Sequence, residues 1–210
     1  MPPRAEAEKI FIDVINRTLR RGGKVLIPVP AVGRAHGIML VIDNYMRKKM
    51  IEEVTVYIDG MISEATAIHT AYPEYLSRSL KNMIIREGIN PFQSEYFNIV
   101  GKQTAAQSLI DIYSWNESSS RQRVREEIAE GEPCIIMATS GMLEGGPVID
   151  YFKHLAPDER NTIVFVSYQI EGTLGRRVQR GLREVSMLNE EGKIEIIKVG
   201  MEVVSIEGFS

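Results

Sequence analysis

The stretch VFVSYQIEGTLGRRVQR, residues 164–180, decides the fold that this sequence predicts. An apolar run rich in β-branched residues passes into a turn bracketed by Gly172 and Gly175, and an arginine-rich helix is expected to begin near Thr173. In α/β proteins, ligands bind where a parallel strand ends and the next helix begins. The stretch therefore indicates both a fold class and the place of a binding site.

The expected start of this helix suits an anion. A helix leaves its first backbone N–H groups without intrahelical partners and directs the positive end of its dipole outward. Gly172 and Gly175 carry no side chain that would keep an anion from the backbone, so a phosphate-rich ligand is predicted. The alternative is that both glycines only shape a tight turn.

Helical spacing predicts two different faces on the same segment. One face is basic, with arginines at i, i+4 and i+7: Arg176, Arg180 and Arg183. The opposite face is apolar and would pack on a sheet, with Val178, Leu182 and Val185. The arginines either contact the anion or solvate a surface helix.

Two further junctions have the same character. IPVPAVGRAH, residues 27–36, contains Arg34, and MATSGML, residues 137–143, contains Ser140, Gly141 and Met142. Because the carboxyl ends of parallel strands meet at one edge of a sheet, we expect all three loops to converge on one ligand.

The rest of the chain alternates apolar runs with helical patterns. This alternation predicts an α/β domain over residues 1–210, with a mostly parallel sheet covered by helices on both faces. Strands are expected at 24–27, 54–58, 97–100, 134–138 and 162–167. Helices are expected at 3–20, 33–49 and 146–154, and Ser119 and Gln122 form a capping box for another that ends near Gly131. The tail predicts a short strand pair, 194–199 and 202–206, joined across Gly200 in a bent or hairpin arrangement.

Composition limits the partners. The chain has 25 basic and 28 acidic residues, so a nucleic acid would have to bind to a local patch. Cys134 is the only cysteine and lies in an apolar run, which predicts a buried structural thiol and a reducing compartment. No apolar stretch approaches the roughly 20 residues that span a bilayer, so a cytoplasmic protein with no membrane contact is expected.

Common cofactor and metal motifs are missing from the sequence. Neither G-x-x-x-x-G-K-[ST] nor G-x-G-x-x-G occurs, which disfavours the usual nucleotide folds. The three histidines, His36, His69 and His154, lack the spacing of a zinc site, so no metal ligand is predicted in this chain. Tyr113 and Trp115 form a separate aromatic pair that is interpreted as a packing or oligomer contact.

Three blocks carry a family resemblance: GGKVLIPVPAVGRA (22–35), MATSGMLEGGP (137–147) and SYQIEGTLGR (167–176). Together, in this order, they resemble the β-CASP domain of metallo-β-lactamase-fold nucleases, the group that includes RNase J and the nuclease subunit of the cleavage and polyadenylation specificity factor. The archaeal homologues of that factor are the most similar. One departure is His36-Gly37, where the family commonly has Gln-Glu.

The resemblance implies a Rossmann-like domain that is an excised part of a larger enzyme. Family nucleases hold a dinuclear zinc site in the metallo-β-lactamase domain into which the β-CASP domain is inserted, and none of those ligand motifs occurs here. Zinc and hydrolysis of RNA phosphodiesters are therefore expected only in the full-length parent, and no catalytic residue is assigned to this chain. RNA and the metallo-β-lactamase domain of the same parent are the implied partners, and a homodimer stays open.

The resemblance gives the three loops the task of holding RNA. Arg34, Arg176 and Arg180 would bind phosphate, and hydroxyls would come from Ser140 and Thr173. The N–H groups of Gly141 and Met142 would act as a helix-terminal anion site, beside those at Gly172 and Gly175, and Tyr168 would stack on a base. Structural alternatives remain: Arg34 pairs with a carboxylate, and Met142 or Tyr168 packs in the core. The rival function is a free-standing doubly wound domain that binds a phosphorylated small molecule or mononucleotide.

Overall fold

A six-stranded parallel sheet forms the centre of the protein in a computed structural model, which describes residues 3–101, 117–189 and 192–209. The strand order is β3-β2-β4-β1-β5-β8, and every neighbouring pair is parallel. The strands are β1 (Val25–Pro28), β2 (Val56–Asp59), β3 (Phe97–Ile99), β4 (Ile135–Ala138), β5 (Thr162–Phe165) and β8 (Glu202–Ser205). The central strands β1, β4 and β5 are buried throughout, as expected for a sheet covered on both sides.

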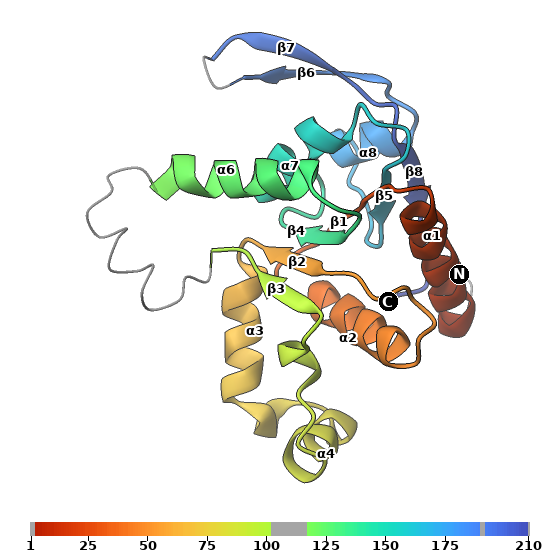
Figure 1. Ribbon diagram of the computed structural model, residues 1–210, viewed down its shortest axis with the longest axis vertical. Coiled ribbons are helices and arrows are strands. Elements are labelled where there is room, and N and C mark those ends of the chain that lie inside the picture. The colour runs from red at the N-terminus through yellow and green to blue at the C-terminus, as the bar shows by residue number, and fades with distance from the viewer. Residues whose placement is uncertain (1–2, 102–116, 190–191, 210) are drawn as a thin grey trace.

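Helices cover both faces of this sheet, which confirms the predicted fold class (Figure 1). One layer contains α1 (Arg4–Arg20), α2 (Arg34–Arg47) and α3 (Ile62–Ala71), followed by η1 (Pro73–Tyr75), α4 (Arg78–Arg86) and η2 (Pro91–Gln93). The other layer contains α6 (Glu117–Glu130), α7 (Pro147–Leu155) and α8 (Leu174–Gln179). Within the described ranges, no helix is long and apolar enough to cross a membrane.

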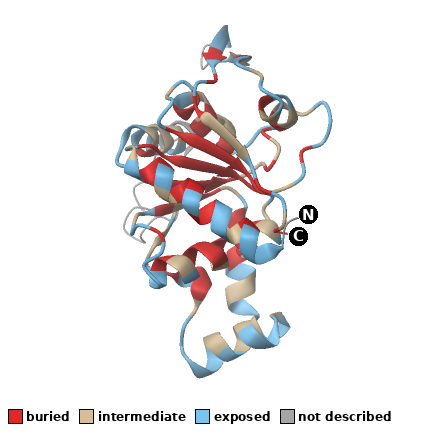
Figure 2. Cartoon of the chain, turned by 90° about the vertical axis from the view of Figure 1, so that its right-hand side faces the viewer, coloured by how far each residue is buried: buried red, intermediate tan, exposed pale blue. Residues whose placement is uncertain are grey.

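Alternation along the strands divides the core into two parts. In β1, Val25 and Ile27 pack in the cluster that contains Phe11 of α1, whereas Leu26 packs in the cluster that contains Phe152 of α7. Figure 2 shows the buried residues concentrated along the strands and on the inward faces of the helices. The sheet is therefore a rigid support for the loops at its edges.

The C-terminal strand pair is present, but its members differ from those predicted. The antiparallel pair joins β6 (Glu184–Leu188) to β7 (Ile194–Lys198), and β8 instead extends the main sheet beside β5. Both predicted strands around Gly200 are present, and of the two predicted arrangements the bent one is found, whereas the hairpin was wrong because the chain does not fold back at Gly200. The N–H groups of Gly200 and Met201 both bond to the Ala156 carbonyl at the end of α7, which directs the chain toward β5.

Helix α8 is shorter than the sequence pattern predicted. It ends at Gln179, because Gly181 adopts a φ of 96° and the next two N–H groups turn back onto the last turn. Gly181 N bonds to Val178 O at 2.9 Å and Leu182 N to Arg177 O at 3.0 Å, the two bonds of a Schellman motif. The predicted basic and apolar faces are therefore wrong at their C-terminal ends: Arg183 lies beyond the helix, and Val185 lies in β6.

The segment before β4 also differs from expectation. Residues Glu117–Glu130 are helical (α6), so Ser119 lies within the helix and is not the N-cap residue of a capping box. Tyr113 and Trp115, interpreted as a packing or oligomer contact, lie outside the described residues.

The first helix is tied to the last strand. Arg17 and Arg21 both form ion pairs with Glu202, and the rings of Phe11 and Phe209 meet edge to face at 5.4 Å. Both ends of the chain consequently lie on the same side of the molecule (Figures 1 and 2).

A buried ionic network joins α6, α7 and the end of β2. Arg125 Nε donates to Asp59 Oδ2 at 2.8 Å, and its Nη1 donates to Asp150 Oδ2 at 2.9 Å. Tyr151 OH donates to the same Asp59 oxygen at 3.0 Å, and burial together with the Asp59 charge raises the pKa of this phenol. Asp59 is 4% exposed, so its charge depends on these partners.

Arg125→Ala should therefore destabilise the protein by about 3 kcal/mol, because Asp59 would be left buried without its cation. Denaturant unfolding gives the measurement. Arg123→Ala is the matched control on the same helix, since the pair of Arg123 with Glu127 is exposed, and its loss should be below about 0.5 kcal/mol. Equal losses in the two variants would contradict a stabilising role for the network.

Candidate functional site

Three loops meet at the carboxyl edge of the sheet, after β1, β4 and β5. Gly141, in the loop after β4, lies so close to Pro30 that an added Cβ would be 2.9 Å from the proline nitrogen. The loop after β5 joins the same group, because Gly175 N bonds to Met142 O at 2.9 Å. The predicted convergence of the loops is therefore present.

A buried glutamine, Gln169, links the loops after β4 and β5. Gln169 is only 1% exposed, and its Nε2 donates to Gly141 O at 2.9 Å and to Ser167 O at 3.2 Å. The Oε1 atom is buried and has no hydrogen-bond partner among the described residues. This oxygen occupies the space beside Gly175, where an added Cβ would be 2.0 Å away. Gln169 was not predicted from the sequence, because a glutamine in a turn has no distinguishing pattern.

A cleft of about 480 Å³ lies between the start of α2, the loop after β5 and the end of β8. Three of the predicted site residues line this cleft: Arg34, Tyr168 and Arg176. Its lining also includes polar residues that the sequence did not indicate: Gln179, Ser205 and Glu207. Tyr168 is 74% exposed, so the alternative that its side chain packs in the core is wrong. Arg34 forms no ion pair or hydrogen bond through its side chain with any described residue, which leaves its charge available.

The other two arginines have partners of their own. Arg176 Nη1 donates to Gln179 Oε1 at 2.6 Å, and its Nε donates to Glu171 Oε2 at 3.4 Å. Arg180 lies just after α8 and donates to the other oxygen of the same carboxylate. Glu171 therefore lies between the two predicted phosphate-binding arginines.

The backbone N–H groups at the start of α8 are not free, contrary to the prediction. Leu174 N donates to Glu144 Oε1 at 2.6 Å, Gly175 N donates to Met142, and Arg176 N donates to Thr173 Oγ1 at 3.3 Å. Gly172 and Gly175 thus shape a turn whose donors are satisfied within the protein.

The predicted helix-terminal site after β4 is also absent from the described structure. Helix α7 begins at Pro147, so Gly141 and Met142 lie in a turn that precedes the helix by several residues. Ser140 Oγ accepts a bond from Glu144 N at 3.0 Å. None of these residues lines the cleft, and neither does Thr173. Ser140 and Thr173 form hydrogen bonds within their own loops, whereas Arg34 and Arg176 line the cleft.

The residues present do not fit a metal. Across residues 3–101, 117–189 and 192–209, no three His, Cys, Asp or Glu side chains come together as metal ligands. Cys134 is buried, and burial raises the pKa of its thiol to about 12, which keeps it protonated.

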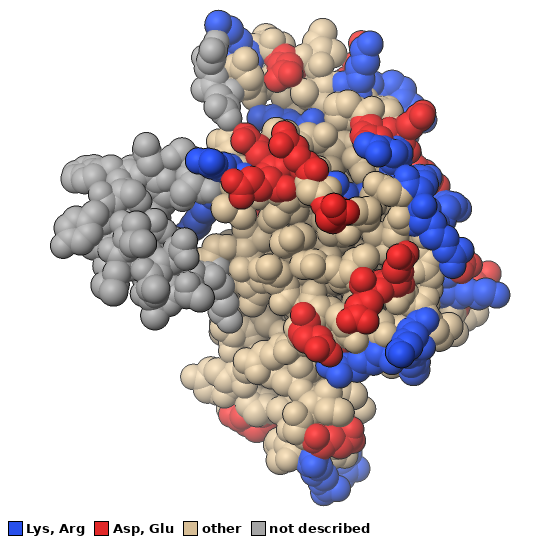
Figure 3. Space-filling model, in the orientation of Figure 1, with Lys and Arg blue, Asp and Glu red and all other residues tan. Residues whose placement is uncertain are grey.

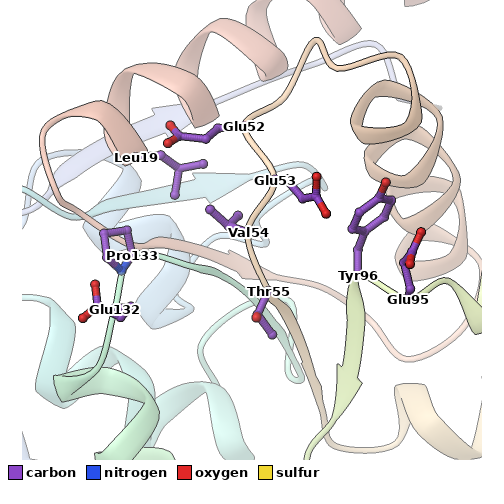
Figure 4. Close-up of a pocket in the computed structure, with 9 residues that line it drawn as sticks. All are labelled: Leu19, Glu52, Glu53, Val54, Thr55, Glu95, Tyr96, Glu132 and Pro133. Carbon is purple, nitrogen blue, oxygen red and sulfur yellow. The ribbon is translucent and has the colours of Figure 1, made fainter.

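The amino edge of the sheet has the opposite character. A cleft of about 620 Å³ lies beside the segments that lead into β2, β3 and β4, and four carboxylates line it: Glu52, Glu53, Glu95 and Glu132 (Figure 4). Partial burial and the charges of Glu53 and Glu95 raise the pKa of Tyr96 in its wall. Figure 3 shows acidic side chains in separate groups and basic ones along the side where α1 lies. A polyanion is disfavoured at this edge.

An α/β domain with a cationic and aromatic cleft at its carboxyl edge is thus defined. Residues 35–178 match the family described as Beta-Casp domain, and the chain belongs to this family, which confirms the resemblance seen in the three sequence blocks.

Relatives cover almost the whole chain. It is 56% identical over 208 residues to "Transcription termination factor FttA" of Pyrococcus abyssi, 99% of this chain and 29% of that protein. A protein of the same name from Methanocaldococcus jannaschii is 49% identical over 210 residues, 100% of this chain and 30% of the relative. The Cenarchaeum symbiosum protein of that name is 50% identical over 209 residues, with shares of 100% and 30%. The chain thus spans less than a third of the length of these relatives.

Gly175→Ala should destabilise the protein by about 2 kcal/mol, because the new methyl group would overlap the Gln169 amide and the Met142 carbonyl. Gly37→Ala is a matched control within α2, where an added Cβ meets nothing within 4 Å. This control should stabilise the protein by about 0.5–1 kcal/mol through helix propensity. Thermal and denaturant unfolding compare the two, and a neutral Gly175→Ala variant would refute close packing of the loops.

The departure at His36 predicts a pH dependence. His36 contacts Thr66 Oγ1 through Nε2 at 3.1 Å, stacks on His69 at 4.0 Å and has a buried Nδ1 without a partner among the described residues. Burial, and then the neighbouring His69, lower the pKa of His36 from 6.5 to about 4. The unfolded chain therefore takes up a proton on this ring at a higher pH than the folded chain does.

Stability should accordingly be full above the unfolded pKa near 6.5 and fall as the pH drops toward 4. The contribution of His36 to this loss is on the order of 3 kcal/mol. His36→Gln removes the titrating group, so its unfolding free energy should depend less on pH across this window. An unchanged slope in the variant would assign the pH dependence to other groups.

Proposed function

We propose that this chain is the RNA-binding β-CASP part of a zinc-dependent ribonuclease that acts in RNA processing or transcription termination. The observation that carries the proposal is the cleft at the carboxyl edge, where Arg34 and Arg176 lie beside the exposed ring of Tyr168. Membership of the Beta-Casp domain family and the name of the relatives support it.

The residues of the cleft suit single-stranded RNA. A guanidinium group binds phosphate oxygens through charge-assisted bonds, and Arg34 is unpaired among the described residues. An exposed aromatic ring stacks on bases without sequence preference, which suits Tyr168. Gln179 Nε2 donates to Ser205 Oγ at 2.8 Å, so polar groups from α8 and β8 are held together in the wall.

The distribution of charge favours RNA binding at the carboxyl edge of the sheet over the amino edge. The net charge of −3 gives no general attraction for RNA, and the amino edge carries the four glutamates of the acidic cleft. Binding would therefore be local to the carboxyl edge and strongly dependent on salt.

The proposal assigns zinc and hydrolysis to a metallo-β-lactamase domain of the same cytoplasmic parent, since the described residues do not fit a metal. The chain itself would bind and orient RNA. The proximity of α1 to the segment after β8, marked by the contact between Phe11 and Phe209, suits a domain inserted into another.

Arg176→Ala should weaken the affinity for a single-stranded oligoribonucleotide by roughly tenfold, since a charge-assisted phosphate contact contributes about 1.5–3 kcal/mol and Arg176 must leave Glu171 to make it. Arg34→Ala should have a similar effect. Arg176→Lys should recover only part of the loss, because an ammonium lacks the two-pronged geometry. Fluorescence anisotropy at several salt concentrations gives the affinities.

Arg78→Ala is the control, because Arg78 begins α4, is exposed and is remote from the cleft. It removes the same charge and should change affinity less than twofold. Wild-type affinity in both cleft variants would refute the proposed site. Loss of mononucleotide binding in those variants, with RNA binding intact, would support the small-molecule function instead.

A further inference from the structure

Glu171 occupies the position between two arginines that a phosphate group would take. Its Oε2 accepts from Arg176 Nε at 3.4 Å, and its Oε1 accepts from Arg180 Nη1. A carboxylate and a phosphate offer the same acceptor atoms to a guanidinium group, so the two compete for one place. The carboxylate belongs to the loop after β5, which also carries Tyr168.

These pairs are weak enough to be exchanged. Glu171 is 64% exposed at its side chain, Arg180 is 59% exposed and Arg176 is 30% exposed, and ion pairs that water can reach contribute little to stability. The buried pair of Asp59 with Arg125 is the contrast, with side chains 5% and 15% exposed. If that buried pair opened, water could not solvate the separated charges of Asp59 and Arg125. Water readily solvates the exposed carboxylate of Glu171 after its release.

Arg176, one of the two arginines that Glu171 holds, lines the cleft, and the cleft indicates what kind of ligand replaces the carboxylate. Arg34 carries a charge with no partner among the described residues, and it lines the same cleft as Arg176. A ligand with several linked phosphates can contact Arg34 first and then displace Glu171 from the other two arginines. A single phosphate gains fewer contacts for the same displacement, so the exchange discriminates against mononucleotides.

We propose that Glu171 is an internal competitor of RNA, a carboxylate that holds Arg176 and Arg180 in the free protein and must be displaced on binding. It thereby determines the affinity of the site and its selectivity for linked phosphates. This inference rests on the proposed RNA-binding function, and the experiment separates the two.

The test uses Glu171→Gln in the full chain, with a 12-nucleotide single-stranded oligouridylate and uridine monophosphate as probes. The amide keeps the size and an acceptor oxygen but removes the charge. RNA affinity should rise by about three- to tenfold, since up to two exposed ion pairs no longer compete. The slope of log affinity against log salt should steepen by roughly 0.7, the value for one additional phosphate contact of a single strand. The affinity for uridine monophosphate should rise by a larger factor, so the preference of the site for the oligonucleotide over the mononucleotide should decrease.

Glu159→Gln is the matched control. Glu159 is exposed, lies between α7 and β5 at the amino edge, and forms no ion pair with a described residue. It changes the net charge equally and should alter RNA affinity less than twofold. An equal gain in both variants would reduce the effect to net charge and overturn the inference.

A double-mutant cycle completes the experiment. If Glu171 acts through its arginines, the gain from Glu171→Gln should disappear when Arg176 and Arg180 are both alanine. A gain that persists in that background overturns the inference. Wild-type affinity in Glu171→Gln, with Arg176→Ala still weakened, also overturns it but leaves the proposed function intact. No RNA binding by the wild-type chain at low salt would overturn the proposed function itself.

Discussion

The space beside Gly141 and Gly175 is filled by backbone and by a buried amide, and the geometry of the carboxyl edge depends on this close contact. Pro30 adjoins the first glycine, and the Met142 carbonyl and the Gln169 side chain adjoin the second. Three loops that are distant in the sequence are thereby held at van der Waals distance. A side chain at either glycine would separate them, and the wall that presents Arg176 and Tyr168 would move with the loop after β5.

Two kinds of ion pair surround this edge, and their burial gives them different tasks. Arg125 connects β2 to α6 and α7 where water is largely excluded, so the pair with Asp59 is costly to open and fixes the position of the helices. Glu171 and Arg180 meet in solvent, where the same chemistry contributes little to stability. Residues of the second kind can change partners without disturbing the fold, which is what a site for an incoming anion requires.

Most of the fold was predictable because the short central strands are continuous apolar runs, and such runs identify strands buried on both faces. The end of α8 could also have been predicted, since a glycine at position 181 is a typical helix stop. The regular spacing of apolar residues up to Val185 instead predicted a longer helix. Strand β8 could not be placed from sequence, because its partner depends on where Gly200 docks against α7. The candidate site was predicted in part: Arg34, Tyr168 and Arg176 line the cleft. Gln169, Glu171 and the Asp59 network were missed because their roles depend on contacts between distant segments, which leave no periodic pattern.

The distribution of charge over the two edges of the sheet explains how a slightly acidic chain can carry a proposed RNA site. The four glutamates of the amino-edge cleft contribute more negative charge than the whole chain has in excess, so the remaining surface is close to neutral or weakly basic. At the carboxyl edge, Glu171 and Glu207 offset part of the arginine charge, and of the two arginines that line the cleft, Arg34 is the one without a partner among the described residues. A nearly balanced site of this kind attracts an anion weakly at long range and depends on contacts made at short range. Recognition at such an edge therefore relies on the geometry of the three loops more than on the general field of the protein.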